Sequence, residues 1–217
     1  LKIPLSKTSA MPNPSWSQTA GPKYCGGYRG GKDSVCPRCY AGQGRFRFQN
    51  VREANKNRYN WFHASPRDQV IGVLVNAYMG QRYARVFVSG DFCHVRCVDT
   101  WIEIVKRCPQ TKWWFPTRCW TNKEYHPALR KLNKRPNVVV RLSNDEIGHP
   151  VPNEVRQSLG INTTSTVYDD LTASCPKQVS HGNCQDAGCL RCWDGRVQEI
   201  TYSLNGGKVN WRKFHAL

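Results

Sequence analysis

Strand-like and helix-like patterns alternate through the central part of the sequence, and this alternation limits the fold more than any other feature. Short runs rich in β-branched and aromatic residues are followed by segments whose apolar residues recur at helical spacing. Runs such as Val138-Val139-Val140 are apolar on both faces, as in parallel strands that are covered by helices. We therefore predict an α/β fold, either a partial (βα) barrel or an open parallel sheet with helices. The strand patterns are too few for a complete eight-stranded barrel.

Capping signals and sequence periodicity locate the individual elements. Asn50 with Glu53, and Thr121 with Glu124, have the spacing of residues that cap the start of a helix. The expected strands are 85–89, 112–116, 137–142, 161–167 and 196–203, and the expected helices are 50–62, 65–80, 95–105, 121–132 and 152–159.

Both ends of the chain lack this alternation. Glycine and proline interrupt the first fifty residues, so we expect a long ordered loop there, and the C-terminal segment is too short for a core of its own without metal. We expect one α/β domain over 1–217, with a cysteine loop at 1–49, a βα core at 50–170 and a C-terminal cysteine segment and tail at 171–217. The sequence shows neither a secretion signal nor a run long enough to span a bilayer, which favours a cytoplasmic protein.

Eleven cysteines are many for this length, and most fall in two groups that contain Cys-x-x-Cys pairs. This usage favours metal over disulfides. The N-terminal group has three members, so a fourth metal position is left for a small molecule or for a cysteine from elsewhere. The C-terminal group has four members and forms a closed set, which suits either zinc or an iron-sulfur cluster. The candidate metal ligands are Cys25, Cys36 and Cys39 in the first group and Cys175, Cys184, Cys189 and Cys192 in the second.

Cys93 and Cys97 lie four residues apart, with His94 between them. We expect these two cysteines to be structural or to line a pocket, because Cys108 lies too far along the chain to complete a compact ligand set and free cysteine packs well in cores. Cys108 and Cys119 are expected in the core or at its boundary.

Polar residues follow three of the expected strands at the point where each strand ends. The carboxyl ends of parallel strands meet at one edge of a sheet, where ligands bind, so these side chains are expected to converge on one pocket. Each of them alone is also a common cap of the following helix or turn. The candidates for substrate contact are Ser89, Asp91, Thr117, Arg118, Ser143, Asn144 and Asp145.

The formal net charge of +17 suggests a polyanionic partner, either a nucleic acid or a phosphate-bearing ligand, although a basic and merely solvated surface also explains it. A stretch that mixes arginine with aromatic residues is typical of single-stranded nucleic-acid binding, because aromatic rings stack on bases while arginine neutralises phosphates. The alternative is that these aromatics line the core while the arginines extend outward. The candidate nucleic-acid contacts are Arg45, Arg47, Phe48 and Arg58.

Four stretches carry a resemblance to a known family: 36–48 with its Cys-Pro-Arg-Cys-Tyr start, 88–92 with 101–104, 114–118, and 175–193 with its four cysteines. Together they resemble a bacteriophage family called gene product eighty-eight, over most of the chain. The resemblance implies a viral protein of the host cytoplasm that holds one or two 4Fe-4S clusters on a radical-SAM-like scaffold. In radical-SAM enzymes the open iron of such a cluster binds S-adenosylmethionine, which is therefore a candidate ligand here. The three-cysteine group above the polar strand ends suggests a redox or radical-type enzyme with an unknown substrate.

The cysteine spacing differs from that of radical-SAM enzymes, because ten residues separate Cys25 from Cys36. A C-terminal cysteine that completes the first group would give one shared, fully ligated cluster in place of two centres. A zinc-stapled nucleic-acid-binding protein is the second hypothesis, with zinc at the C-terminal cysteines.

Overall fold

The structure, a computed structural model, describes residues 5–6, 14–169, 173–176, 178, 184 and 188–204. Its strands form one parallel sheet in which the spatial order follows the chain order, β1-β2-β3-β4-β5-β6. In the described residues β6 pairs with β5 and not with β1, so the sheet is open, and the predicted open parallel sheet with helices is confirmed. The strands are β1 Ser15–Trp16, β2 Tyr83–Val86, β3 Lys112–Thr117, β4 Val138–Ser143, β5 Thr164–Tyr168 and β6 Glu199–Ser203.

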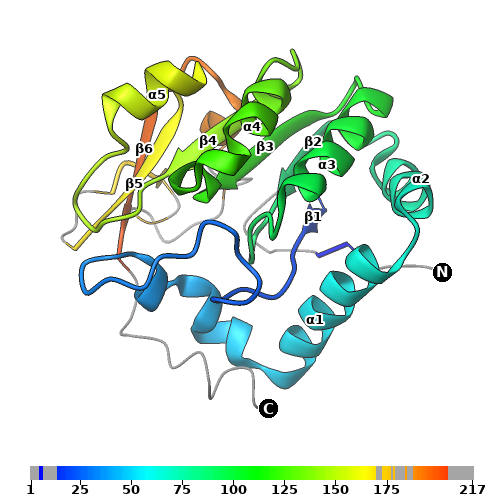
Figure 1. Cartoon of the computed structure of the whole chain (residues 1–217), viewed down its shortest axis with the longest axis horizontal. Helices are drawn as coiled ribbons and strands as arrows, with labels where there is room; N and C mark the ends of the chain where they lie inside the picture. Colours follow the sequence, from blue (N-terminus) through cyan, green and yellow to red (C-terminus); the bar gives the residue numbers. More distant parts are fainter. Residues whose placement is uncertain are drawn as a thin grey trace.

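Helices α2 to α5 follow one another along one face of the sheet, and α1 lies beside the end that carries β1 (Figure 1). Short 3-10 turns occupy the N-terminal cysteine loop and the connections near the strand ends. The α-helices are α1 Gln49–Ala64, α2 Arg67–Tyr78, α3 Val95–Arg107, α4 His126–Asn133 and α5 Asn153–Leu159, and the 3-10 turns are η1 Cys36–Arg38, η2 Tyr40–Gly42, η3 Gly44–Arg47, η4 Cys119–Thr121, η5 Lys123–Tyr125 and η6 Arg191–Trp193.

Every predicted strand and helix is present, but several boundaries differ. Asn50 lies inside α1, whose cap is Phe48, so the predicted cap is wrong. Likewise Asn122, not Thr121, accepts a hydrogen bond from the backbone N–H of Glu124, and this bond starts the turn η5 before α4 begins. The two-residue strand β1 was not predicted, because it falls in a proline-rich stretch and is too short to show a period.

Alternation along β3 separates two hydrophobic clusters on opposite faces of the sheet. Trp113 and Phe115 belong to the large cluster that packs against the helices. Trp114 points to the other face, where it contacts the ring of Trp193 at a centroid distance of 5.3 Å. The C-terminal segment therefore covers the face of the sheet that the helices leave open.

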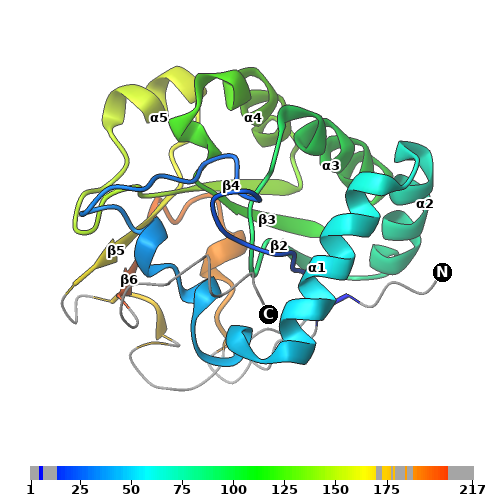
Figure 2. The same cartoon turned by 60° about the horizontal axis from the view of Figure 1, so that its bottom comes forward.

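The N-terminal loop crosses the carboxyl ends of the strands (Figure 2). Its backbone is tied to the segments that follow β2 and β4: the N–H of Gln18 donates to the carbonyl of Ser89, and the N–H of Val35 donates to the carbonyl of Asp145. These bonds place the first cysteine group over the edge of the sheet where the predicted polar residues lie.

Among the described residues, no helix combines the length and the apolar character that a membrane crossing requires.

Candidate functional site

A cavity of about 350 Å³ lies at the carboxyl ends of the strands, between the N-terminal loop and the C-terminal segment. Both cysteine groups contribute to its wall. All three N-terminal cysteines line it, and so do three of the four C-terminal ones, whereas Cys189 does not. The cysteines on the wall are Cys25, Cys36, Cys39, Cys175, Cys184 and Cys192.

Asp91 is the best-anchored acid of the cavity. Its carboxylate accepts hydrogen bonds from the Thr117 hydroxyl and from the backbone N–H groups of Phe92 and Arg118, each at 2.8 Å. Burial raises the pKa of Asp91 above its ordinary value, although these three donors favour the ionised form. The carboxylate therefore holds the loops after β2 and β3 together at the floor of the cavity.

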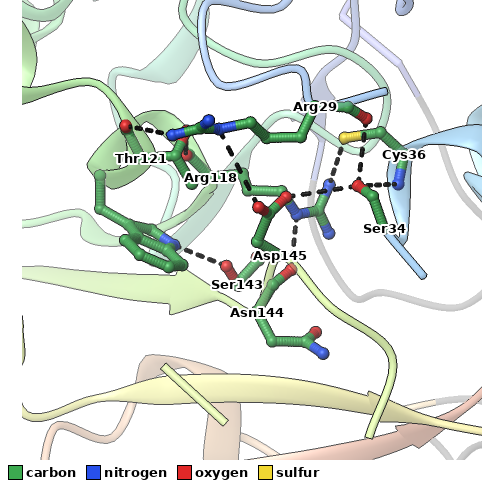
Figure 3. A network of polar contacts seen from close by, with 9 residues as sticks. Arg29, Ser34, Cys36, Arg118, Thr121, Ser143, Asn144 and Asp145 are labelled. Atoms are coloured by element: carbon green, nitrogen blue, oxygen red, sulfur yellow. Dashed lines mark hydrogen bonds and ion pairs between the residues drawn. The ribbon is translucent and has the colours of Figure 1, made fainter. Parts of the chain in front are cut away.

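The guanidinium of Arg118 links this floor to the first cysteine group. Its Nε donates to the carbonyl of Asn144 at 2.6 Å, and its Nη1 lies 3.5 Å from the sulfur of Cys36 (Figure 3). Burial opposes the charged form of Arg118, but the nearby thiolates and Asp91 raise its pKa overall. Arg118 is thus a fixed cation beside sulfur.

Burial is the main influence on two of the N-terminal thiols, Cys25 and Cys39. Burial raises the pKa of Cys25, and the charge of Asp91 raises it further. Burial also raises the pKa of Cys39, whereas Arg118 lowers it. These sulfurs therefore need added positive charge to become good thiolate ligands.

The C-terminal cysteines have different neighbours. Burial raises the pKa of Cys192 to about 11, against a hydrogen bond with Tyr202 and the charges of Arg85 and Arg141. Cys175 is also buried and contributes to the same hydrophobic cluster as Cys192. Cys184 belongs to this cluster in part, and its carbonyl accepts from the N–H of Cys189 at 2.8 Å. Within 177–187 the structure describes only Gln178 and Cys184.

The predicted substrate-contact residues do converge. Six of the seven line the cavity, and the exception is Asp145, whose carboxylate accepts from the Ser34 hydroxyl at 3.3 Å and faces Arg29 at 4.0 Å (Figure 3). Asp145 therefore holds the N-terminal loop against the segment that follows β4. The six on the wall are Ser89, Asp91, Thr117, Arg118, Ser143 and Asn144.

The candidate nucleic-acid residues divide into two kinds. Arg45, Arg47 and Phe48 are exposed, and Phe48 keeps 59% of its surface in solvent. Arg58 is buried and donates to the side-chain oxygen of Asn55 at 2.7 Å and to the carbonyl of Ser17 at 3.3 Å. The assignment of Arg58 to a binding surface is therefore corrected, because its guanidinium is used inside the protein.

A cluster of side chains that could hold a metal ion lies outside the cavity. Cys97 is buried in the hydrophobic core and Cys93 packs against it, as expected for structural residues; neither lines the cavity, and their sulfurs face His63 and His94. From the sequence a metal site was set aside here because Cys108 is too distant, and His63, which lies in the last turn of α1, thirty residues before Cys93, was not brought in. The available signal was the Cys-His-x-x-Cys pattern combined with a histidine at the end of the preceding helical region.

The fold and the cavity define a class: an α/β protein with an open parallel sheet, whose cysteines from both chain ends meet at the carboxyl ends of the strands. The family model described as gene product 88 matches residues 6–201, and the chain belongs to this phage gene-product family. No curated protein and no solved structure matches the chain.

Proposed function

We propose that the protein is an iron-sulfur protein whose cavity holds a 4Fe-4S cluster on Cys25, Cys36 and Cys39. The observation that carries this proposal is the meeting of both cysteine groups on the wall of one cavity. Soft thiolates in such number select zinc or iron-sulfur clusters over hard cations. A cluster of several irons also suits thiols that line a cavity, because it spreads its ligands further apart than a single ion does.

The chemistry of the sulfurs fits a bound cluster. Without a metal, burial keeps Cys25 and Cys39 protonated, while Arg118 already supplies one positive charge beside Cys36 and Cys39. Iron would supply the remaining positive charge and convert the thiols to thiolates. Three cysteine ligands would leave one iron facing the cavity, where S-adenosylmethionine or another small molecule is the expected ligand.

The residues of the chain itself would position a substrate. Asp91 is held by three donors and Arg118 by the Asn144 carbonyl, so neither group needs to reorganise when a ligand enters. A bound cluster would supply electrons, and Ser89, Thr117 and Ser143 offer hydroxyls on the same wall. This arrangement supports a redox or radical-type enzyme. The radical-SAM-like scaffold and the location in the host cytoplasm rest on the resemblance alone, and no substrate is assigned.

We assign the C-terminal cysteines to a second centre, either a second cluster or zinc. The first group shares its electrostatic environment with Arg118 and Asp91. Cys192 shares its environment with Cys175, Tyr202, Arg85 and Arg141. The different cations, Arg118 near Cys39 and Arg141 near Cys192, support the assignment to two centres.

The test is the iron and acid-labile sulfide content of protein purified without air. The parent, Cys36→Ser and Cys192→Ser are compared, with Cys108→Ala as the control because Cys108 is buried away from the cavity. Two clusters predict partial loss of iron in each serine variant and none in the control. A zinc ion at the C-terminal cysteines predicts loss of all iron in Cys36→Ser and of none in Cys192→Ser. Complete loss in both would show one shared centre, and a parent without iron and sulfide would overturn the proposal.

A zinc-stapled nucleic-acid-binding protein is the second candidate, favoured by the exposed side chains of Arg45, Arg47 and Phe48 just before α1. Phosphate contacts through these arginines would make binding to single-stranded RNA or DNA weaken as salt rises. The double variant Arg45→Ala with Arg47→Ala should reduce both affinity and salt dependence, whereas Lys134→Ala, an exposed change after α4, should alter neither. Absence of salt-dependent binding by the parent would remove this candidate.

A further inference from the structure

We propose that His63, Cys93, His94 and Cys97 form a separate, structural zinc site. One ligand atom from each of the four residues lies within 4.8 Å of the others. The set combines two thiols with two imidazoles, which is the ligand chemistry of closed tetrahedral zinc sites. The site is distinct from the cavity, because none of the four residues lines it.

Two of the distances between ligand atoms lie in the range of a tetrahedral zinc ion, and a third is shorter. Zinc bonds to sulfur and nitrogen place neighbouring ligand atoms about 3.3 to 3.8 Å apart in a tetrahedron. The sulfur of Cys93 lies 3.3 Å from Nε2 of His63, and the sulfur of Cys97 lies 3.6 Å from either ring nitrogen of His94. The two sulfurs are 3.1 Å apart, so a zinc ion bound to both requires them to separate by about 0.7 Å.

The pKa shifts of His63 and Cys97 favour ligand behaviour. Burial, together with the nearby His94, lowers the pKa of His63 to about 4, so its imidazole is neutral and has a free lone pair at neutral pH. The hydrogen bond between the two thiols lowers the pKa of Cys97 and raises that of Cys93, and backbone N–H groups lower the pKa of Cys97 further. Tyr59 adds a hydrogen bond to Cys93, which is the kind of outer contact that orients metal ligands.

A disulfide explains these contacts less well. The sulfurs of Cys93 and Cys97 are 3.1 Å apart, whereas a disulfide bond is about 2.05 Å long. A disulfide would also leave unexplained why the rings of His63 and His94 come together, with centroids 5.3 Å apart.

The position of the site gives it a structural role. It joins the last turn of α1 to the start of α3 through the loop that contains Asp91. The carbonyl of Phe92, between Asp91 and Cys93, accepts a hydrogen bond from the N–H of Gly26 at 2.7 Å. Zinc would therefore fix the loop that carries the cavity's acid and, through Gly26, the loop that carries Cys25.

The first experiment measures zinc per chain in the full-length protein. The variants His63→Ala and Cys97→Ala are expected to lose one zinc relative to the parent. His149→Ala, an exposed histidine, and Cys108→Ala, a buried cysteine outside the cluster, are expected to keep it. Cys36→Ser should also keep this zinc while it loses iron, so failure here is distinguishable from failure of the iron-sulfur proposal. Equal zinc in the parent and in both cluster variants would overturn the assignment.

The second experiment uses the unmodified chain and so does not depend on how a variant folds. The native protein is alkylated with and without a zinc chelator, and the labelled cysteines are identified by peptide mapping. Zinc predicts that Cys93 and Cys97 are protected until the chelator is added. Labelling that the chelator leaves unchanged, or a Cys93–Cys97 disulfide in freshly prepared protein, would refute the site.

Discussion

Arg141 offers a sharp test of how the C-terminal cysteine segment is held. Its side chain is fully buried on β4, and burial lowers the pKa of the guanidinium from its ordinary value. Its two terminal nitrogens donate to five backbone carbonyls, and four of these lie within 191–198, the part of the chain that contains Cys192. The acceptors are the carbonyls of Thr164 and Val197 at 3.0 Å, Arg191 at 3.2 Å, and Asp194 and Gln198 at 3.4 Å.

Replacement of Arg141 by Met keeps much of the volume and removes every one of these donors. The two shortest of the five bonds are those to Thr164 and Val197, at 3.0 Å, so the loss falls mainly on them. Two hydrogen bonds from a charged donor contribute about 3 to 6 kcal/mol. Because the buried guanidinium no longer has to be desolvated, we expect a net loss of about 2 to 4 kcal/mol.

The assay is equilibrium unfolding in urea, at one metal content, for the parent, Arg141→Met and Arg107→Met. Arg107 is exposed at the end of α3, so its replacement should change the free energy of unfolding by less than about 0.5 kcal/mol. Arg141→Met should also lose metal from the C-terminal cysteines before the N-terminal ones. A free energy of unfolding equal to that of the control would refute the role assigned to Arg141.

Three further predictions concern the cavity and its walls. Gly27→Ala should destabilise the protein by about 1 to 3 kcal/mol in urea unfolding, because a Cβ there would lie 2.3 Å from the Arg118 carbonyl carbon. The helical control is Gly72→Ala, whose Cβ meets nothing within 4 Å, and equal stability of the two variants would contradict the prediction. Trp193→Phe removes the indole N–H that donates to the Ala84 carbonyl at 2.8 Å, so the free energy of unfolding should fall by about 1 kcal/mol in the same assay. An unchanged unfolding midpoint would argue against that hydrogen bond. Asp91→Asn should lower the pKa of Cys25, because the charge of Asp91 adds to the effect of burial in raising that pKa. The pH dependence of Cys25 alkylation in metal-free protein measures the shift, and an unshifted profile would disprove the coupling.

The sequence predicted the fold well because its signals were local. A strand such as 138–143 shows its burial in its own apolar run, and α3 shows its single buried face in the spacing of its apolar residues. The errors lie where a boundary depends on a contact from elsewhere. Asn122, for example, caps η5 although Thr121 has the better spacing, and β1 exists only because its two residues pair with β2.

The cavity was partly predictable for the same reason. Parallel strands bring their carboxyl ends to one edge, so the polar residues after β2, β3 and β4 had to come close together. The chain order says nothing about partners that arrive from distant segments. This is why Arg58 was placed on the surface although it bonds to Ser17, and why His63 was not linked to Cys93.

The arginines near the cysteines bear on what the cavity holds. Arg118 lies beside Cys36, Arg85 lies over the ring of Trp114 and donates to the Tyr40 hydroxyl, and the buried Arg141 lies near Cys192. A guanidinium that is wholly or partly removed from water is stabilised by a nearby negative charge, which neutral thiols do not provide. Thiolates bound to an iron-sulfur cluster carry net negative charge and would provide that compensation. Each cysteine group has an arginine nearby, as expected if both groups bind metal as thiolates. Part of the net charge of +17 would then balance the cavity and not an external polyanion.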